Sequence, residues 1–470
     1  MTENPENFEK DNKNFSVKRF EEMQKKSATY FFDVEEFENI IDYYLDHNNI
    51  KKADQVVVYA QSVHPGSVIL MLKSAQVNGS NGKLIKALEI LKQIEAVEPF
   101  NPEVYLTKAG ILRQLRDHKG AIKCFKDALK YMDEEEDDIY VDLAFEQEHI
   151  NDYDGAIESL KKALEINAEN EAALYEITYC FDIGNKCNDC VDYLVSFLDE
   201  NPYAFIGWYN LGNTYFKLEN FEKSIEAFEF CNAIKEDFSS AYFNKANAFV
   251  QITKYQEAIE AYKSALENET PMPVTYGYIG ECYEKLEAFD LSEVYYKKAL
   301  ALDENYADAY VGMGVINELQ KHFSIALNYY QKALEIDPEN TDYWYVYAEG
   351  LSNAGFKDEA LNTYKYMIAE FDQEIDTWLD YADLVLEMKS STDALLIIEG
   401  ALEIFPKNSE LLYRKAAYLI MHGKLKDAYH HLEVALEQNF EMHTDFVEYY
   451  PEALKISNVT KLIELYKTKE

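Results

Sequence analysis

Two cysteines of this 470-residue chain stand at a spacing that many zinc and disulfide-exchange sites use, Cys187-x-x-Cys190. A structural zinc ion needs four ligands, and no second pair follows at ligand spacing. Nothing around the pair predicts the strand of a thioredoxin-like site. Cys190 and Cys231 instead occupy positions where other copies of an internal repeat carry alanine. We interpret both as small core residues and predict no metal site there.

Other motifs that would carry catalysis are missing from the sequence. It contains no glycine-rich phosphate loop, no HExxH and no Ser-His-Asp order in a suitable context. His430 and His431 are neighbours on one expected helix and face different directions, which argues against a shared metal. The acidic run from Asp133 to Asp138 lacks the glycine turn of a calcium loop, so we expect a solvated loop. We predict a non-enzymatic protein without catalytic residues, metal ions or cofactors.

The charge of the chain limits its partners. The 45 Lys and Arg residues against 86 Asp and Glu residues give a net charge of -41, which repels nucleic acid and acidic membranes. The acidity has two interpretations: solubility for a large surface, or attraction of basic segments of a partner. No apolar window is long enough for a membrane span, and the N-terminus lacks the apolar core of a secretory signal. We therefore expect a cytoplasmic protein without membrane insertion.

A period of 34 residues organises most of the chain. One small residue per period marks the register, and ten of the eleven steps between these residues are 34 and one is 35. Nine of the twelve are alanine, and the others are Cys190, Ser224 and Ser292. The small residues stand at positions 53, 87, 121, 156, 190, 224, 258, 292, 326, 360, 394 and 428.

Small and large residues alternate around these positions. Seven positions further on, nine of twelve residues are Ala or Cys, and twelve positions before, ten of twelve are Gly or Ala. Two helices can approach closely only where small side chains face each other, and large residues must fill the space beside that contact. Aromatic residues recur sixteen positions before and four positions after the small residue. The pattern predicts pairs of antiparallel helices joined by short turns.

The stretch WYNLGNTY, Trp208 to Tyr215, carries a known repeat signature, W-x2-L-G-x2-Y. The match continues with Phe228 in place, whereas Ser224 replaces the alanine and Glu236 replaces the proline of that signature. The chain thus resembles the tetratricopeptide-repeat family, in a long all-repeat form of bacterial type. The resemblance implies an all-α fold, an α-solenoid of about twelve 34-residue helix-turn-helix repeats in a right-handed superhelix. First helices would make the concave wall, where the family usually binds protein segments.

The register predicts four parts of the chain. Residues 1–15 are polar and aperiodic and are expected to be a flexible tail. Residues 16–33 are expected to form an N-terminal capping helix, with Ser16 as its N-cap and with Val17, Phe20 and Met23 on its buried face. Residues 34–442 are assigned to twelve repeats, and residues 443–470 to C-terminal capping helices.

Family geometry places residues fifteen, fourteen and eleven positions before each small residue on the concave wall. In the fifth to seventh repeats these residues are rich in tyrosine and asparagine. Asparagine amides can bond the backbone of an extended peptide, and aromatic rings can supply apolar contact. The alternative is a solvated wall with incidental asparagines. The predicted peptide-binding residues are Tyr175, Tyr179, Tyr209, Asn210, Asn213, Phe216, Phe243, Asn244 and Asn247.

The C-terminal half of the predicted wall is acidic instead. Its carboxylates suit a basic segment of a partner, although a solvated acidic face is the alternative interpretation. In the best copy of the repeat, Ala307 to Asn340, the residues expected to face the groove are Asp308, Val311 and Val315. The acidic residues of this half are Asp308, Glu349, Asp380 and Asp383.

Two functions follow from this sequence. The first is a scaffold or adaptor that binds extended or helical segments of partner proteins in its concave groove. The second is a structural subunit that holds a larger assembly together through its convex face and ends.

Overall fold

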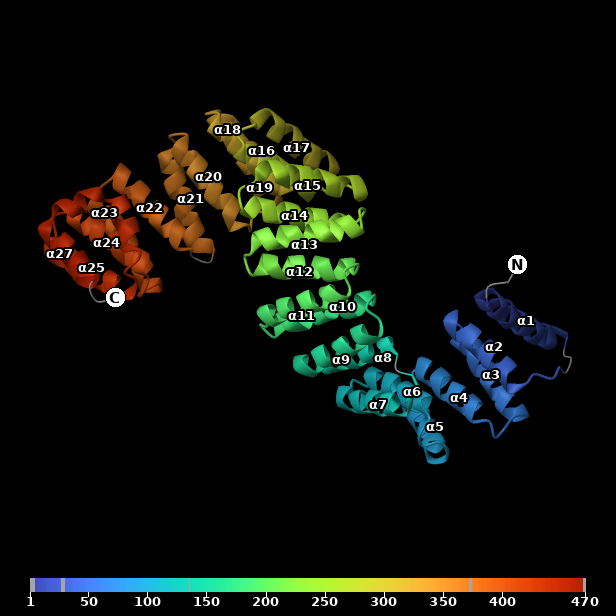
Figure 1. Cartoon of the computed structure of the whole chain (residues 1–470). Helices are drawn as coiled ribbons and strands as arrows, with labels where there is room; N and C mark the ends of the chain where they lie inside the picture. The colour runs from blue at the N-terminus through green and yellow to red at the C-terminus, as the bar shows by residue number, and fades with distance from the viewer. Residues whose placement is uncertain (1–4, 27–29, 135, 372–373, 468–470) are drawn as a thin grey trace. The chain divides into compact units, whose positions relative to one another are not determined.

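The computed structural model describes residues 5–26, 30–134, 136–371 and 374–467. These residues form 27 α-helices and one short 3-10 helix, without a strand among them (Figure 1). The chain divides into two compact units, Met1–Ala248 and Phe249–Glu470, which are described separately. None of the described helices has the length and apolar character needed to cross a bilayer.

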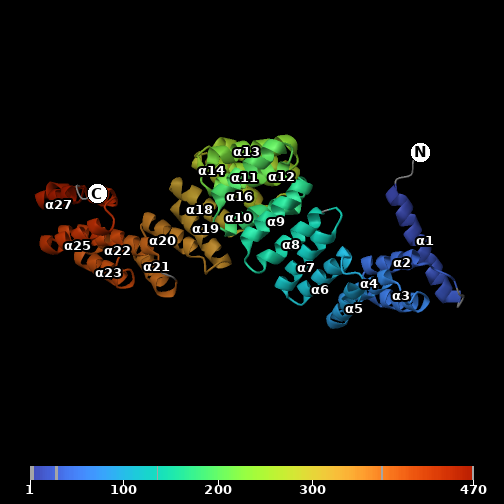
Figure 2. The ribbon, with the colours of Figure 1, turned by 60° about the horizontal axis from the view of Figure 1, so that its bottom comes forward.

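Unit 1 begins with α1 (Pro5–Lys26) and continues in helix pairs that lie side by side in Figures 1 and 2. After the last of these pairs comes α14 (Ser239–Gln251), within which the division between the units falls. The pairs are α2 (Val34–Asp46) with α3 (Ile50–Val63), α4 (Val68–Ser80) with α5 (Leu84–Val97), α6 (Pro102–Gln114) with α7 (His118–Tyr131), α8 (Asp137–Glu148) with α9 (Tyr153–Ile166), α10 (Glu171–Ile183) with α11 (Cys187–Glu200), and α12 (Phe205–Lys217) with α13 (Phe221–Ile234).

Unit 2 contains α15 (Tyr255–Asn268), further helix pairs and a C-terminal group of short helices. The pairs are α16 (Pro273–Lys285) with α17 (Phe289–Leu302), α18 (Ala307–Leu319) with α19 (Phe323–Ile336), α20 (Thr341–Asn353) with α21 (Lys357–Glu370), α22 (Ile375–Met388) with α23 (Ser391–Ile404), and α24 (Ser409–Met421) with α25 (Leu425–Gln438). The C-terminal helices are α26 (His443–Tyr449), η1 (Pro451–Lys455) and α27 (Ser457–Lys467). The predicted all-α solenoid class is confirmed, whereas the count of twelve repeats and the right-handed superhelix stay predictions.

Close helix approach fixes the register of the pairs. Each of the twelve small residues is the fourth residue of a second helix, and each is at most 1% exposed. In three repeats the residue twelve positions earlier is a glycine that has no room for a side chain. A Cβ atom on Gly314 would lie 2.3 Å from the Tyr330 ring, and one on Gly212 would lie 2.6 Å from the Phe228 ring. The alternation of small and large residues therefore determines how the two helices of each pair pack against each other.

The turn inside each pair depends on one residue with positive φ, five positions before the small residue. Eleven of the twelve turns have it, and only three of these eleven residues are glycine. The exception is Lys389, with φ of -127°. Gly184 stands in one of these turns as the C-cap of α10, and the next residue, Asn185, takes the left-handed conformation at φ 53°. Asparagine tolerates this region better than most residues, so glycine is not required there.

The N-terminal helix is longer than the sequence predicted. It begins at Pro5, so residues 5–15 are helical, while residues 1–4 of the expected tail lie outside the described residues. Proline suits a first helical turn, and no glycine interrupts the stretch that follows. Ser16 was expected to be an N-cap, yet it lies inside the helix and is 6% exposed. The predicted buried face is confirmed, since Val17, Phe20 and Met23 all belong to a core cluster with α2 and α3.

The acidic run also differs from its prediction. Helix α8 begins at Asp137, so the last two acidic residues stand in its first turn rather than in a loop. The Asp137 carboxylate accepts hydrogen bonds from the side-chain amides of Asn167 at 2.7 Å and Asn170 at 2.8 Å. These bonds, that from Asn170 above all, lower the pKa of Asp137. The Asp137 carboxylate therefore links the first turn of α8 to the loop between α9 and α10.

Candidate functional site

The first candidate site is a cavity of about 200 Å³ in unit 1, which we call the tyrosine-asparagine cavity. Helices α10 and α12 supply most of its wall, and α11 supplies two cysteines. Four of the nine predicted peptide-binding residues line it. The complete lining is Tyr175, Thr178, Tyr179, Asp182, Cys187, Cys190, Asn210, Asn213, Thr214 and Lys217.

Two tyrosines one helical turn apart present the apolar surface of this cavity. Tyr175 is 41% exposed and Tyr179 is 49% exposed, although large aromatic rings usually lie deeper in a fold. The Tyr175 ring meets the Tyr209 ring edge to face, with 6.5 Å between their centroids. Partial burial raises the pKa of Tyr175, so its hydroxyl stays neutral and can donate a hydrogen bond.

Asn210 needs a correction. The sequence placed its side chain on an open groove wall, but it is only 3% exposed. Its Nδ2 atom donates to the backbone oxygen of Leu174 at 2.7 Å, which joins α12 to α10 of the preceding pair. The amide satisfies a helix carbonyl that Thr178 also uses. The Nδ2 group of Asn210 thus already has a partner within the protein. The side chain forms part of the cavity wall and is not one of a row of amides open to a peptide backbone.

Asn213 and Asn244 form a polar bridge instead of two separate peptide anchors. Nδ2 of Asn244 donates to Oδ1 of Asn213 at 2.8 Å and lies 3.2 Å from the Tyr209 hydroxyl. Tyr209 is held in turn by the rings of Phe228 and Phe238, at centroid distances of 5.9 and 5.1 Å. The structure brings these predicted residues together, but much of their hydrogen-bonding capacity is already used by partners within the protein.

Like Tyr209 and Asn244, the last three predicted residues do not line the cavity. The Phe216 ring packs edge to face on Phe221 at the start of α13, at a centroid distance of 5.4 Å. Phe243 and Asn247 are half-buried on α14, and both make contacts with other residues. The sequence period placed them on the first helices correctly. It could not predict that neighbouring side chains would occupy them.

The two cysteines at redox-like spacing behave as cavity wall. Cys190 is buried, and this burial raises the pKa of its thiol to about 11. The Cys187 thiol lies 3.8 Å from a carboxylate oxygen of Asp182, which also forms an ion pair with Lys217 across α10 and α12. A buried neutral thiol is a poor nucleophile, which agrees with the interpretation of Cys190 as a small core residue.

The second candidate site is a cavity of about 280 Å³ in unit 2, which we call the tyrosine-carboxylate cavity. Helices α16 and α18 supply most of its wall. Asp308, Val311 and Val315, which the sequence placed on the groove side of this repeat, all line it. The complete lining is Gly277, Tyr278, Glu281, Glu284, Tyr296, Tyr306, Asp308, Val311, Gly312 and Val315.

Tyrosine hydroxyls hold the carboxylates around this cavity. The Tyr296 hydroxyl donates to Glu284 at 3.0 Å, and the Tyr343 hydroxyl donates to Asp308 at 2.6 Å. Burial raises the pKa of Glu284 and, together with the Glu284 charge, raises that of Tyr296. The sequence analysis missed these pairs, because it assigned the tyrosines to packing alone. A usable signal was present: a glutamate stands twelve residues before the buried tyrosine in two successive repeats, at Glu284 and Glu318.

The same pairing continues toward the C-terminus of unit 2. Asp380 accepts a hydrogen bond from Tyr345, and Asp383 accepts hydrogen bonds from Tyr418 and Tyr449. Asp383 also forms an ion pair with Arg414. Burial, with neighbouring carboxylates as a smaller cause, raises the pKa of Asp380 and of Glu349.

Three of the four acidic residues predicted for this wall are therefore bound to tyrosines. They are Asp308, Asp380 and Asp383. A fully solvated acidic face is thus not what the structure contains.

Sequence comparisons with family models match several repeats. Models described as tetratricopeptide repeat match residues 102–131, 137–170, 207–238, 243–307 and 307–340. These segments lie in both units. A search of curated protein sequences gave no match.

Solved structures are similar to parts of this chain, and two of the three that follow are titled tetratricopeptide repeat or TPR proteins. The MamA protein is 26% identical, covers 36% of this chain and 93% of its own, and superposes with a TM-score of 0.32. A tetratricopeptide repeat protein from Parabacteroides merdae is 13% identical, with 57% and 92% coverage and a TM-score of 0.41. YrrB, titled a TPR protein with an unusual peptide-binding site, is 21% identical, with 42% and 97% coverage and a TM-score of 0.32.

Proposed function

Because this chain belongs to the tetratricopeptide-repeat family, whose members generally mediate protein-protein interactions and assembly, we propose that it is a non-enzymatic scaffold. It binds a segment of a partner protein along its first helices. The tyrosine-asparagine cavity is the primary contact site for that segment.

The observation that carries this proposal is the exposure of Tyr175 and Tyr179 beside a cavity. Exposed rings at the rim of a pocket are the usual energetic centre of a protein interface. Their apolar faces gain most from desolvation by a partner side chain. The cavity of about 200 Å³ suits one large side chain rather than a whole peptide.

Polar groups around the rim define the rest of the segment. The carboxylate of Asp182 and the ammonium group of Lys217 form an ion pair at one side of the cavity. Asn213 and Thr214 offer amide and hydroxyl groups on α12. These groups suit the backbone of an extended or helical segment that places one aromatic or aliphatic anchor between the tyrosines.

A peptide-display selection would test the proposal. The wild-type protein is used to select peptides, and their affinities are compared with those of a Tyr175→Ala/Tyr179→Ala variant. We expect at least about a tenfold loss, because truncation of two interface aromatics costs more than 1 kcal/mol. Tyr203→Ala is the matched control, since that side chain is 82% exposed and lies outside the cavity lining. Equal affinity of all three proteins would contradict this placement.

Basic segments are the second part of the proposal. The tyrosine-carboxylate cavity contains Glu281, Glu284 and Asp308 in its lining. A lysine-rich peptide should bind unit 2 with an affinity that falls as salt concentration rises, because opposite charges are screened. A Glu281→Gln/Asp308→Asn variant should lose that salt dependence. If binding depended neither on salt concentration nor on these substitutions, the acidic residues of this cavity would be excluded as the contact site for the peptide.

A structural subunit remains the alternative, and exposed apolar side chains on second helices favour it. Val58 on α3, Ile85 on α5 and Leu396 on α23 are each more than half exposed. Such residues could contact other subunits of an assembly. Light scattering across a concentration series distinguishes the two functions, because self-assembly that Val58→Ser and Ile85→Ser abolish would support the structural role.

A further inference from the structure

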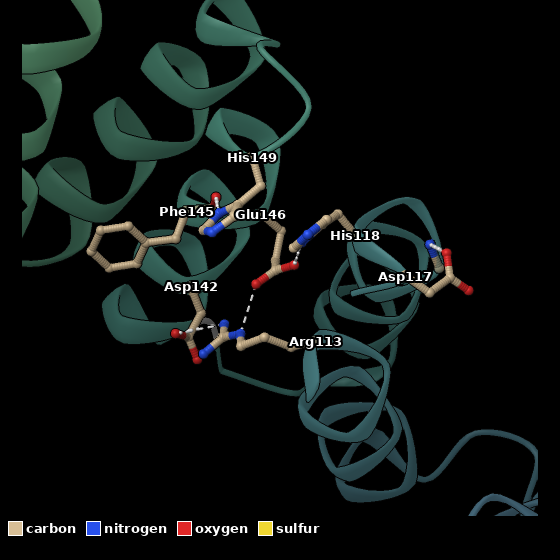
Figure 3. A network of polar contacts seen from close by, with 8 residues as sticks. Arg113, Asp117, His118, Asp142, Phe145, Glu146 and His149 are labelled. Carbon is tan, nitrogen blue, oxygen red and sulfur yellow. Dashed lines mark hydrogen bonds and ion pairs between the residues drawn. The ribbon is translucent and has the colours of Figure 1, made fainter. Parts of the chain in front are cut away.

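Three potential metal ligands meet in unit 1, and none of them lines either cavity. They are His118, the first residue of α7, Glu146 on α8 and His149, which caps α8. Their ligand atoms all lie within 4.8 Å of one another, which no other group of at least three His, Cys, Asp or Glu residues achieves in the described part of the chain. Figure 3 shows Glu146 extending from α8 toward His118 and Arg113.

The carboxylate at the centre is almost completely buried. Glu146 is 1% exposed, and it has two partners, Nε of Arg113 at 2.7 Å and Nδ1 of His118 at 2.9 Å. Arg113 also lies 2.9 Å from Asp142, an ion pair that lacks hydrogen-bond geometry at its buried Nη2 atom. One guanidinium charge therefore faces two carboxylates. Two carboxylates around one guanidinium group favour the approach of a further cation.

The orientation of His149 suits a ligand. Its Nδ1 atom lies 2.7 Å from the backbone oxygen of Phe145, and a carbonyl oxygen can only accept a hydrogen bond. Nδ1 therefore carries the proton, and in the neutral ring the lone pair is on Nε2. This arrangement, with a backbone carbonyl fixing one ring nitrogen, is what metal-ligating histidines commonly have.

The two imidazole rings already lie side by side. The rings of His118 and His149 are stacked, with 4.6 Å between centroids and 19° between planes. Nδ1 of His118 donates its hydrogen to the nearer oxygen of Glu146 at 2.9 Å, so an ion bound between these two atoms displaces that proton. Bond lengths of about 2.0 to 2.2 Å to a tetrahedral zinc ion put two ligand atoms roughly 3.3 Å apart. A small opening of that contact, with rotation of the exposed His149 ring, would bring three ligands to one ion.

We propose that His118, Glu146 and His149 form a binding site for a divalent first-row transition metal of the Zn²⁺ class. Two imidazoles and one carboxylate match the ligand preferences of this class, and solvent supplies the remaining coordination. The ion links the start of α7 to the end of α8. Bound metal would therefore fix two successive helix pairs of unit 1 against each other.

The sequence analysis predicted no metal site, because it considered only the cysteine pair, the acidic run and the adjacent histidines. The missed signal was Glu146-x-x-His149 at the end of one helix, a spacing that puts both side chains on one face. His118 joins them only through the turn between helix pairs. Spacing along the chain therefore gave one half of the site.

The test uses the full-length, untagged protein after removal of metals with a chelator. Calorimetric titration with Zn²⁺ alone should detect one specific ion per chain, and Co²⁺ should give the visible absorption of a protein-bound ion. His149→Gln removes an exposed ligand and leaves the buried pairing of Glu146 with Arg113 intact, so this variant should still fold. We expect its affinity for Zn²⁺ to be at least about tenfold lower.

His118→Gln should weaken the same binding event, whereas His430→Gln should not. His430 is a matched control because its ring is 5.4 Å from that of His431, and no third ligand completes that pair within the described residues. Hydrogen exchange gives a second readout, because Zn²⁺ should slow exchange in α7 and α8 of the wild type only. Absence of Zn²⁺ binding to the wild type, or equal binding by His149→Gln, would overturn the proposal.

Discussion

The tyrosine-asparagine and tyrosine-carboxylate cavities use the same scaffold for opposite surfaces. Each is built mainly by two successive first helices, α10 and α12 in unit 1 and α16 and α18 in unit 2. The first presents exposed tyrosines and amides, while the second presents carboxylates held by tyrosine hydroxyls. The packing residues are alike in both. Lining chemistry can therefore change from repeat to repeat without any change in the helix contacts.

One repeat position shows how the difference arises. The residue four positions after the small residue is Phe228 in unit 1 and Tyr296 in unit 2, and both are buried. Eight positions before the small residue, unit 1 has Phe216, whose ring packs on Phe221, and unit 2 has Glu284. The Tyr296 hydroxyl, which Phe228 lacks, donates a hydrogen bond to this buried carboxylate. This hydroxyl donor lowers the free-energy cost of burying a carboxylate in unit 2.

The largest expected effect tests the shared scaffold. Gly212→Ala and Gly314→Ala each place a Cβ atom within 2.6 Å of an aromatic ring, so each should lower the free energy of unfolding of its own unit. Overpacking of this kind costs about 1 to 3 kcal/mol. Denaturant unfolding monitored by hydrogen exchange would report each unit separately.

Gly110→Ala is the control for these substitutions. No atom lies within 4 Å of the position its Cβ would take, so the change should stabilise α6 by about 0.5 to 1 kcal/mol. If Gly212→Ala destabilised unit 1 but Gly314→Ala left unit 2 unchanged, the two cavities would not share one packing scheme.

The second prediction breaks the hydrogen bond that distinguishes the cavities. Tyr296→Phe leaves the buried Glu284 without its tyrosine donor, which should cost about 1 to 3 kcal/mol of unfolding free energy in unit 2. Tyr330→Phe should cost less, because Glu318 keeps the Asn353 amide at 2.7 Å, whereas Glu284 keeps only the longer contact with Lys285 at 3.5 Å. Thermal melts of the two variants, compared with wild type, measure this order.

Tyr364→Phe is the matched control for the pair. Tyr364 occupies the same repeat position, but Ser352 stands where the other two repeats have glutamate. The change should therefore be the mildest of the three. Equal destabilisation by all three substitutions would mean that the hydroxyl-carboxylate pairs contribute nothing specific to unit 2.

The third prediction concerns pH. Burial raises the pKa of Glu284 above its ordinary value of 4.5, so the folded chain binds this proton more tightly than the unfolded chain does. The stability that this group contributes is complete below pH 4.5 and is lost as pH rises through the folded pKa. Glu284→Gln should therefore flatten the decline of unit 2 stability over that window.

Urea midpoints of the wild type and Glu284→Gln at several pH values would measure this change. Glu222→Gln, on the exposed side of α13 in unit 1, reports what the loss of one surface charge does. A wild-type curve for unit 2 that rose from pH 4.5 upward and was unaltered by Glu284→Gln would refute the assigned direction.

Much of the fold was predictable from residue size at a fixed period. The twelve small residues are all buried, because every helix pair must solve the same problem of close approach. Val17, Phe20 and Met23 were predictable for a similar reason, since their helical spacing puts them on one face. The start of α1 at Pro5 was not, because polar residues without apolar periodicity carry no signal of this kind.

The candidate sites were less predictable, because their chemistry depends on contacts between repeats. The bond from Asn210 to Leu174 joins residues 36 positions apart. His118 and Glu146 are 28 positions apart. A period places side chains on a wall, but it does not determine which neighbours will use their hydrogen-bonding groups. The sequence therefore overestimated how many amides on these first helices lack partners within the protein.

The prediction with the smallest expected effect tests whether the asparagine amides of unit 1 bond within the protein or to a bound peptide. Asn244→Ala removes the bridge to Asn213 and Tyr209, and it should cost about 0.5 to 1.5 kcal/mol in local stability. Its effect on the affinity of a selected peptide should stay below about threefold, well under that of Tyr175→Ala/Tyr179→Ala, because the amide already serves the protein. The same titrations measure both variants. If Asn244→Ala weakened binding as much as Tyr175→Ala/Tyr179→Ala does, the amides would contact the peptide backbone directly. The peptide-binding asparagines predicted from the sequence would then be the better description of unit 1.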